Sequence, residues 1–450
     1  MSKIIDAVSV VFSYKEKIFT IKRQNYLKAF PGYLAFPGGK VDKVDHSSTE
    51  HLPDHFKTFP AHLVNAMIRE VKEEMNFDVV REFQNKTIDA IHYLGVAITP
   101  DFNPVRFATH FYRINLAQDL PLEANADEAK EFGWYTPHHL HQNYLQGETL
   151  VVPPIMKLIE HLVREPHLNQ IIDLDFHYDS NSEVPMIESI IGLRQLPVLS
   201  NTLLPATRTN CFVIGDKDSN VVAMDPSPKD LSEYSKMLSV LNKLGINSIM
   251  LSHHHGDHNE FAPKLAKDLG LPLMMSHDTF SRLKNIHGEE WFLNQSIQFL
   301  KDGDVLTKWL GEDVLIHSIP GHDEGHLGLA PRSNKWFIVG DLFQGVGTVV
   351  IGGAEGSMKK YFSTLEKIID LAPKAVFPSH GIGLGGTHIL EKTLEHRKMR
   401  EKQVLEMFQE GKSKEEMLAT IYFDVDPRLH KYAMANIESH LDKLREENKL

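Results

Sequence analysis

The sequence of 450 residues contains a single cysteine, Cys211. An intrachain disulfide and a zinc site built from cysteines are therefore excluded, and histidine and carboxylates remain as the usual metal ligands. No run of about 18 apolar residues is present, and the first residues have neither a long apolar core nor a small-residue cleavage site. We therefore expect a cytoplasmic protein with no signal peptide, no transmembrane helix and no membrane partner.

Positive charge is also scarce. Lys and Arg total 48 against 60 Asp and Glu, which gives a formal net charge of −12. No global field attracts nucleic acid or anionic lipid, so a polyanionic substrate would need local basic residues or a bound metal. Hydrophobic residues at 42% and charged residues at 24% are ordinary for a globular protein. At roughly 150 residues per domain, the length predicts two or three domains.

The residue pattern changes near the middle of the chain. Alternation over residues 6–12, followed by a polar turn, predicts a hairpin that opens a mixed sheet, and residues 66–75 have helical spacing. A polar, His-containing insertion precedes that helix and ends near Pro60. From about Val184, short β-rich runs alternate with helical ones, which is typical of a layered α/β fold.

After His380 the chain becomes helical and charged, and Ser413 with Glu416 forms a capping-box signature. We expect a multidomain protein of the α/β and α+β classes. The predicted parts are a first domain, a linker, a second domain and a C-terminal helical segment, at residues 1–170, 171–186, 187–388 and 389–450.

Three glutamates share one face of the helix expected over residues 66–75. Glu70, Glu73 and Glu74 are spaced i, i+3, i+4, so they repel one another unless a cation binds. Oxygen ligands suit Mg²⁺ or Mn²⁺, which can bridge phosphate oxygens and activate a water. Gly38 and Gly39 would let the backbone approach this helix closely. The competing interpretation is a solvated acidic helix.

The segment Phe36-Pro37-Gly38-Gly39, followed by Arg69-Glu70-Val71-Lys72-Glu73-Glu74-Met75-Asn76-Phe77, resembles the Nudix box. The resemblance covers about residues 4–165. It implies an α/β/α sandwich that hydrolyses a nucleoside diphosphate linked to another moiety. It also implies that Glu70, Glu73 and Glu74 bind metal and that Arg69 braces the loop through an ion pair. Two departures are Asn76, where Gly is usual, and the long insertion.

Residues 21–42 resemble the peroxisomal coenzyme A diphosphatase branch of that family, as do residues 98–100 and 134–137. The coenzyme A motif of the branch is only partly met. The resemblance implies coenzyme A or acyl-coenzyme A as the substrate. Glu128 and Glu131 are the weak candidates for a general base, with surface acids near Trp134 as the alternative.

A second constellation follows the apolar run 248–251. His253 and His255 are two residues apart, so in an extended chain they point to the same side. Asp257 and His258 follow Gly256, where the chain can turn and aim them at a second ion. By composition, such a pattern arises by chance in roughly 0.6% of chains like this one, so an incidental surface cluster is a poor explanation.

Three later segments each place a candidate ligand just past a predicted strand: His322, Asp341 and His380. Any one of them alone would be unremarkable. His326 also lies in the first of these segments, and we expect it to be a hydrogen-bonded structural histidine.

Together these segments resemble the metallo-β-lactamase superfamily, which implies an αβ/βα sandwich. The resemblance implies one metal held by His253, His255 and His322 and another held by Asp257, His258 and His380, with Asp341 bridging them. It implies two Zn²⁺, with Mn²⁺ or Fe²⁺ as alternatives. Residues 209–215 and 222–225 resemble the entry strands of the glyoxalase II type, in which Asp225 would orient the ligands.

The tail from Glu395 resembles the β-lactamase-like endoribonuclease subgroup, which carries a C-terminal winged-helix-like segment; the resemblance covers about residues 190–450. Four basic residues in this tail would contact RNA phosphates or simply lie on a solvated helix: Arg397, Lys398, Arg400 and Lys402. The interleaved Glu395 and Glu401 favour the solvated helix.

The leading hypothesis is a bifunctional metal-dependent hydrolase. Its Nudix domain would cleave a pyrophosphate in a small nucleotide-linked molecule, and its second domain would hydrolyse an ester, thioester or phosphodiester. Glu73, Glu74 and Asp257 are the expected catalytic carboxylates, and acyl-coenzyme A carries both kinds of bond. The alternative is an endoribonuclease that acts on RNA, with the Nudix domain as a non-catalytic ligand-binding or regulatory module. A homodimer is compatible with either hypothesis.

Overall fold

The computed structural model describes residues 3–47, 51–103 and 105–450. Met1 and Ser2, and residues 48–50 of the predicted insertion, lie outside the described residues. The chain divides into two compact units. The first contains the residues up to Tyr178 together with Glu188–Ile191, and the second contains Asp179–Ile187 together with Gly192–Leu450.

The first unit is built around one mixed sheet with the strand order β3-β2-β1-β5-β4, and β6 pairs with β2. The predicted hairpin forms between β1 and β2, which pair antiparallel, whereas β1 and β5 pair parallel. The strands are β1 (Ile4–Tyr14), β2 (Lys17–Arg23), β3 (Leu34–Ala35), β4 (Ile88–Ile98), β5 (Arg106–Leu116) and β6 (Ala129–Tyr135). The helices are η1 (Lys43–His46), η2 (Asp54–Thr58), α1 (Ala61–Met75), α2 (Val79–Gln84), α3 (Pro137–Leu145) and α4 (Pro153–Arg164).

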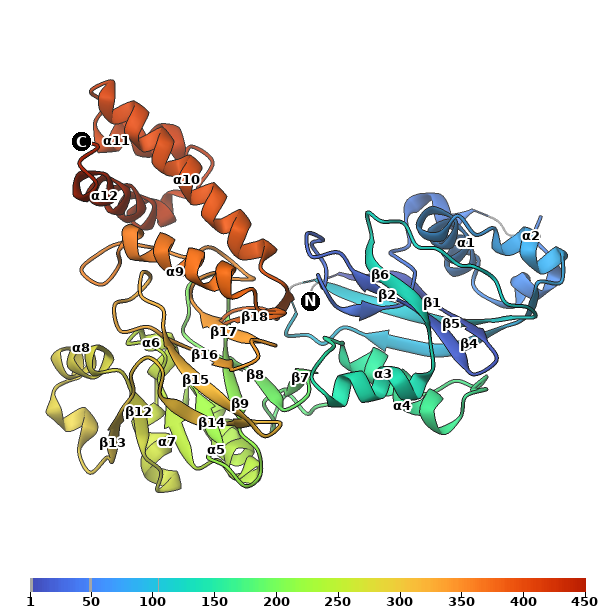
Figure 1. The fold of residues 1–450 in the computed structure, drawn as a ribbon, viewed down its shortest axis with the longest axis horizontal. Coiled ribbons are helices and arrows are strands. Elements are labelled where there is room, and N and C mark those ends of the chain that lie inside the picture. The colour runs from blue at the N-terminus through green and yellow to red at the C-terminus, as the bar shows by residue number, and fades with distance from the viewer. Residues whose placement is uncertain (1–2, 48–50, 104) are drawn as a thin grey trace. The chain divides into compact units, whose positions relative to one another are not determined.

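Helices cover both faces of this sheet (Figure 1). Val10 and Phe12 of β1 pack in the same cluster as Met67 of α1. Val11, between them, packs with Leu158 of α4 on the other face. This alternation follows from the two-residue period of a strand. The predicted α/β/α sandwich is therefore confirmed.

The insertion before α1 contributes buried apolar side chains, although most of its residues are polar. Phe56 of η2 is fully buried and Leu52 is nearly so, and both join the cluster between α1 and the sheet. The segment is therefore partly a core element, because two apolar side chains among its polar residues find a place under α1.

The second unit contains two sheets. One has the order β13-β12-β11-β10-β9-β8 and the other the order β14-β15-β16-β17-β18-β19. The strands of the first are β8 (Leu193–Leu199), β9 (Arg208–Ile214), β10 (Val222–Met224), β11 (Ser248–Met250), β12 (Leu273–Met275) and β13 (Ile297–Phe299). The short strand β7 (Ile187–Ile190) falls at the division between the units, with only Ile187 in the second. The strands of the second are β14 (Val305–Trp309), β15 (Glu312–Ser318), β16 (Leu327–Pro331), β17 (Phe337–Gly340), β18 (Ala375–Pro378) and β19 (Leu384–Gly385).

The two sheets pack face to face, with helices outside. Cys211 and Val213 of β9 pack with Met237 of α5, whereas Phe212 points to the other sheet and meets Phe377 of β18 at a ring-centroid distance of 6.2 Å. The helices that accompany the sheets are α5 (Leu231–Leu244), α6 (Gly256–Asn259), α7 (Ala262–Leu269), α8 (His277–His287), η3 (Glu289–Phe292) and α9 (Met358–Leu371). The predicted αβ/βα sandwich is confirmed.

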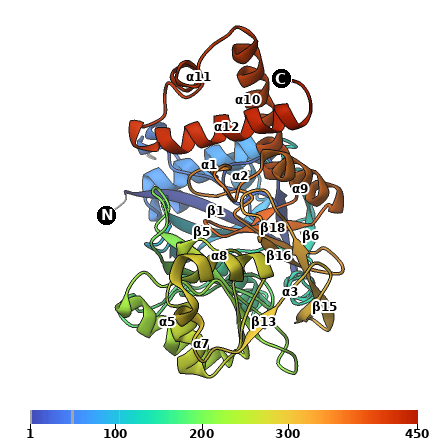
Figure 2. The same cartoon turned by 90° about the vertical axis from the view of Figure 1, so that its left-hand side faces the viewer.

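The C-terminal segment consists of α10 (His388–Gln409), α11 (Lys414–Ile421), η4 (Pro427–Leu429) and α12 (His430–Glu446). The predicted capping box forms, with Ser413 and Glu416 bonded reciprocally. Ile437 and Leu441 of α12 pack with Val404 of α10 and Met417 of α11. Both views show α10 and α12 beside α9 (Figures 1 and 2). No helix in the described part of the chain combines the length and the apolar content needed to span a bilayer.

Candidate metal centres

The histidine-rich site of the second unit is assembled from the ends of four strands. β11 leads through buried Ser252 to His253 and His255, and the single turn of α6 carries Asp257 and His258. His322, Asp341 and His380 follow β15, β17 and β18. These strands lie in both sheets, so the sandwich brings together residues that are up to 127 positions apart in the sequence.

Three imidazoles converge at one point. His255 Nδ1 lies 3.0 Å from His253 Nε2 and 3.0 Å from His322 Nε2. One ring nitrogen offers either one hydrogen or one lone pair, so His255 Nδ1 cannot satisfy both neighbours. A shared cation would accept all three lone pairs. The donor set His253, His255 and His322 therefore fits a metal ion.

A second group lies beside the first. Asp257, His258 and His380 offer ligand atoms within 4.8 Å of one another. Asp341 Oδ2 lies 3.6 Å from His258 Nε2 and 3.7 Å from His322 Nε2, so its carboxylate reaches both groups. Its Oδ1 lies 3.5 Å from His380 Nε2.

Several atoms that face this point are buried without a hydrogen bond. Among the described residues, His258 Nε2, His380 Nε2 and Asp341 Oδ1 have no hydrogen-bond partner. An unsatisfied buried polar atom costs about 1–3 kcal/mol, so three together at one point call for a ligand. A divalent cation meets that need, and the residues present fit two such ions.

The opposite ring nitrogen of each histidine has its own polar neighbour, which fixes the nitrogen that faces inward. The neighbours are Ser252 Oγ at 2.8 Å from His253 Nδ1, Asp225 Oδ2 at 2.9 Å from His258 Nδ1, Val350 O at 2.9 Å from His322 Nδ1, Arg208 O at 2.8 Å from His380 Nδ1 and Glu355 Oε1 at 3.9 Å from His255 Nε2. The rings are thus oriented before any ion binds.

Asp225 links two of these contacts. It adopts the left-handed conformation with φ of 56°, and its carboxylate accepts hydrogen bonds from the backbone N–H and the hydroxyl of Ser252, at 2.7 and 2.6 Å. The structure places Asp225 behind His258 and Ser252, outside the ring of ligand atoms.

At His253, His322 and Asp341 the electrostatics favour the protonation states that metal ligands need. Burial, and then the neighbouring histidines, hold the pKa of His253 well below its usual value, and burial lowers the pKa of His322 to about 4. Burial would raise the pKa of Asp341, but His380 and His258 outweigh it and hold that pKa well below its usual value. Asp341 is therefore ionised at neutral pH, and His253 and His322 are neutral. At His258 and His380 burial would lower the pKa, but Asp257 and Asp341 outweigh it and raise the pKa of both rings, so a metal would have to displace a proton there.

His326 differs from its expected role. It is fully buried, and neither ring nitrogen has a hydrogen-bond partner among the described residues. Burial lowers its pKa to about 3, so the ring is neutral at physiological pH. Its ring packs against Gly340, which has a φ of 57°, and a side chain at that position would collide with it. His326 therefore packs as an apolar ring beside Asp341.

Three further residues at this site, His254, Asp323 and Glu355, were not among the expected ligands. Asp323 is fully buried, and its Oδ2 lies 2.6 Å from His254 Nδ1. The adjacency of His254 and Asp323 to expected ligands was the available signal. Glu355, beside His255, had no such signal in the sequence, because it lies in an irregular segment before α9.

The glycine turn and the glutamate helix of the first unit meet as expected. The Gly38 N–H donates to Glu74 Oε2 at 2.9 Å, and a Cβ at Gly39 would lie 2.5 Å from the Glu70 carboxylate. Burial raises the pKa of Glu74 to about 7, and the hydrogen bond from Gly38 opposes this only in part. Asn76, at the end of α1, takes the left-handed conformation with φ of 49°, which Asn tolerates better than most residues.

Arg69 holds this loop through Asp45, which the sequence analysis did not single out. Its guanidinium donates to both oxygens of Asp45, at 3.0 and 2.8 Å, and to the Lys40 carbonyl at 3.0 Å. It also contacts Glu70 at 2.8 Å and Glu73 at 3.2 Å. The only signal for Asp45 was its acidic side chain in the loop that Arg69 was expected to brace.

The three glutamates do not form a compact ligand set. Within the described ranges, the trios of ligand atoms that lie within 4.8 Å of one another all come from the second unit. Glu70 and Glu73 turn to Arg69, whereas Glu74 turns to Gly38. Of the weak candidates for a general base, Glu128 lies 3.9 Å from Arg23 and Glu131 lies 3.4 Å from Lys22.

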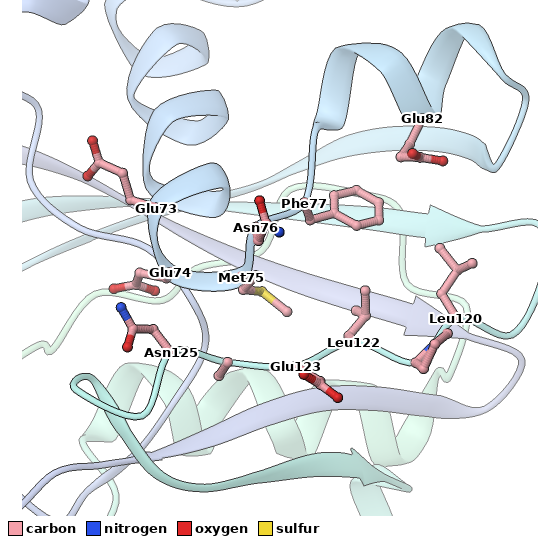
Figure 3. Close-up of a pocket in the computed structure, with 12 residues that line it drawn as sticks. Glu73, Glu74, Met75, Asn76, Phe77, Glu82, Leu120, Leu122, Glu123 and Asn125 are labelled. Carbon is pink, nitrogen blue, oxygen red and sulfur yellow. The ribbon is translucent and has the colours of Figure 1, made fainter.

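A pocket of about 540 Å³ opens beside Glu73 and Glu74, at the C-terminal end of α1 (Figure 3). Four of its lining residues are acidic and none is Lys, Arg or His. The lining residues are Glu73, Glu74, Met75, Asn76, Phe77, Glu82, Leu120, Pro121, Leu122, Glu123, Ala124 and Asn125. Phosphate would be repelled by this lining unless a cation neutralised it.

The basic residues of α10 are engaged within the second unit. Arg397 is buried, not solvated, and donates to the Val349 carbonyl at 2.5 Å. Lys398 pairs with Glu366 at 2.8 Å, and Lys402 lies 3.8 Å from Glu406. Arg400 donates to Gln403 at 3.0 Å. These residues do not form a row of unengaged cations.

Comparison with known families assigns three segments. Residues 204–380 match the metallo-beta-lactamase superfamily, residues 413–450 match the beta-lactamase associated winged helix domain, and residues 3–152 match the NUDIX domain. The predicted resemblances to these families are confirmed. Nudix and metallo-β-lactamase proteins are metal-dependent hydrolase families.

Individual relatives agree with this assignment. The chain is 28% identical over 263 residues to the Beta-lactamase-like protein 2 homolog of Drosophila melanogaster, covering 54% of this chain and 84% of that protein. It is 27% identical over 176 residues to a hydroxyacylglutathione hydrolase of Bdellovibrio bacteriovorus, covering 39% and 64%. A beta-lactamase domain protein from Burkholderia ambifaria has the same fold, with a TM-score of 0.52 and 18% identity over 60% of this chain and 90% of that one.

Proposed function

We propose that this chain, in which a Nudix domain is followed by a metallo-β-lactamase domain and its associated winged helix, is a bifunctional hydrolase with two separate metal centres. The observation that carries the proposal is the convergence of His253, His255, His322 and Asp341 on one buried point. There, His255 Nδ1 faces the ring nitrogens of His253 and His322, and Asp341 Oδ1 has no hydrogen-bond partner among the described residues. The opposite nitrogens of His253 and His322 are hydrogen-bonded.

In the second unit, His253, His255 and His322 would hold one ion and Asp257, His258 and His380 the other, with Asp341 between them. Zn²⁺ suits this set, and Mn²⁺ or Fe²⁺ would also accept it. When bound, the ions supply Lewis acidity that polarises a carbonyl or phosphoryl oxygen and makes water a nucleophile at neutral pH. Asp257, whose side chain is 17% exposed, would accept the proton of the attacking water.

A thioester is the favoured substrate of this unit. The internal contacts of Arg397 and Lys398 argue against a phosphate-binding stripe along α10, which a single-stranded RNA would need at a net charge of −12. The names of two kinds of relative point the same way: a hydroxyacylglutathione hydrolase, and an atrochrysone carboxyl ACP thioesterase of Claviceps purpurea at 24% identity.

In the first unit, Glu70, Glu73 and Glu74 would bind Mg²⁺ or Mn²⁺ and cleave a pyrophosphate in a nucleotide-linked molecule. The acidic lining of the adjacent pocket supports a cation-dependent approach of the phosphates. Arg69 would keep the glycine loop against the helix while the glutamates turn to the ions. Coenzyme A and its thioesters are the substrates we propose, because one acyl-coenzyme A offers a bond to each unit.

Product analysis by mass spectrometry tests both halves. The purified chain is incubated with an acyl-coenzyme A, Mg²⁺ and Zn²⁺, beside Glu73→Gln, His255→Ala and the matched surface control Lys392→Ala. We expect His255→Ala to stop release of free coenzyme A and Glu73→Gln to stop release of adenosine 3′,5′-bisphosphate, with the control unchanged. Absence of both products in the wild type would remove the shared substrate.

The alternative function, an endoribonuclease whose Nudix domain only binds a ligand, is supported by the matched winged-helix segment at residues 413–450. It predicts cleavage of single-stranded RNA that needs His255 and is indifferent to Glu73→Gln. Incubation of the same variants with a labelled RNA distinguishes the two functions.

A further inference from the structure

The irregular segment from Val349 to Met358 borders the metal site of the second unit. The Val350 carbonyl accepts a hydrogen bond from His322 Nδ1 at 2.9 Å. Glu355 Oε1 lies 3.9 Å from His255 Nε2. Near its end, the Ser357 N–H donates to the Gly321 carbonyl at 2.8 Å, directly before His322. This segment therefore touches two of the three histidines, His255 and His322, whose ring nitrogens converge with that of His253.

The other side of this segment is held by the C-terminal helices. The Ile351 N–H donates to Asn436 Oδ1 of α12 at 2.9 Å, and Arg397 of α10 donates to the Val349 carbonyl. These two bonds flank Val350 on either side. The Met358 N–H donates to Ser439 Oγ of α12 at 3.0 Å.

Close packing accompanies these bonds. A Cβ at Gly352 would lie 2.7 Å from the carbonyl oxygen of Ala435, so the segment lies directly on α12. Asn436 and Arg397 are both buried. Behind them, Lys443 of α12 donates to Glu401 of α10 at 2.8 Å, so an ion pair joins the two helices.

We infer that the C-terminal helices are a positioning element of the metal centre: through Asn436 and Arg397 they fix Val350, whose carbonyl orients His322. The inference rests on the proposed metal-binding function. It assigns Asn436 as a positioning residue that touches neither ligand nor ion. Loss of a hydrogen bond made directly to a ligating histidine typically lowers metal affinity about 10–100-fold, so the indirect contact of Asn436 should act at the lower end of that range, about 10-fold.

The test is calorimetric titration of the metal-free full-length chain with Zn²⁺. The two binding steps are assigned with His322→Ala and His380→Ala. We expect Asn436→Ala to weaken the His322 step about 10-fold and to spare the His380 step. Asn436→Asp, which keeps an acceptor for the Ile351 N–H, should recover most of the affinity.

Ile437→Val is the matched control, because it removes a buried methyl group from the next residue of α12 without touching the Val349–Met358 segment. Equal affinity of Asn436→Ala and Ile437→Val for Zn²⁺ would overturn the inference. Arg397→Met serves as the second variant if Asn436→Ala does not fold, with the same expected loss. A wild-type chain that binds no Zn²⁺ would instead defeat the proposed function, and the inference with it.

Discussion

The two candidate metal sites contrast in how the chain builds them. In the first unit, the glutamates come from two turns of one helix, and their carboxylates are held apart by Arg69 and Gly38. In the second, ligands from four strand ends already face one another, with buried unpaired atoms at the centre. The helix site is therefore local and would have to rearrange to bind ions, whereas the histidine site is preorganised by tertiary structure.

The largest expected effect comes from breaking the preorganised site. Asp341→Asn removes the charge shared by both ligand groups, so thioester hydrolysis should fall about 10³-fold, equivalent to several kcal/mol of lost transition-state stabilisation. Steady-state rates and the metal content of the purified variant measure this. Pyrophosphate hydrolysis should be unchanged, and a variant that keeps both metals and a tenth of the thioester activity would contradict the assignment.

The corresponding change in the local site is Glu74→Gln. We expect pyrophosphate hydrolysis to fall about 10²-fold, because a catalytic carboxylate is lost while glutamine can still accept the Gly38 N–H. Product release from coenzyme A measures the rate, and thioester hydrolysis is the internal control. Full activity of this variant would remove Glu74 from the catalytic residues, whereas absence of pyrophosphate hydrolysis in the wild type would favour a Nudix domain that only binds a ligand.

The stability of the first unit should depend on the bond that braces its loop. Arg69→Met leaves the Asp45 carboxylate, 2% exposed, without its partner and should cost about 3 kcal/mol. Urea unfolding followed by the fluorescence of Trp134 measures the loss. Lys57→Met, which removes an exposed ion pair with Asp54, is the control and should stay near the wild type.

A smaller effect on stability is expected when the pH is lowered, because the Arg69–Asp45 ion pair depends on the charge of Asp45. Burial would raise the pKa of Asp45, but hydrogen bonds from Arg69 and the Asp42 N–H outweigh it and hold that pKa below its usual value. The stabilisation is therefore complete above about pH 4, the unfolded value, and is lost as the pH falls through the lower folded value. The stability gap between the wild type and Asp45→Asn should narrow in that acidic window, and a constant gap would refute this.

The smallest effect is expected on the surface of α10. Lys398→Ala removes an exposed ion pair with Glu366 and should change stability by less than about 0.5 kcal/mol. Anisotropy with a labelled single-stranded RNA at several salt concentrations should show no change. A salt slope reduced by about one would assign Lys398 to a phosphate contact and favour the RNA hypothesis.

Local sequence patterns predicted several helices and strands of the fold correctly. Alternation in residues 6–12 predicted β1, the spacing of Glu70, Glu73 and Glu74 predicted their shared helix, and Ser413 with Glu416 predicted the capping box. The helix α1 begins at Ala61, directly after Pro60 and earlier than predicted, and its first turn already buries Leu63 and Val64. Such features depend on interactions among a few consecutive residues, so they can be predicted from the sequence alone.

The sequence by itself also identified candidate ligands that converge in the second unit, because His253, His255, Asp257 and His258 lie in one short motif. Only the tertiary structure decided what surrounds them. The pairing of Arg69 with Asp45, the contact of His322 with Val350 and the bond of Asn436 to Ile351 join positions 24 to 85 residues apart. No local pattern encodes such contacts, since they exist only once packing has brought separate elements together.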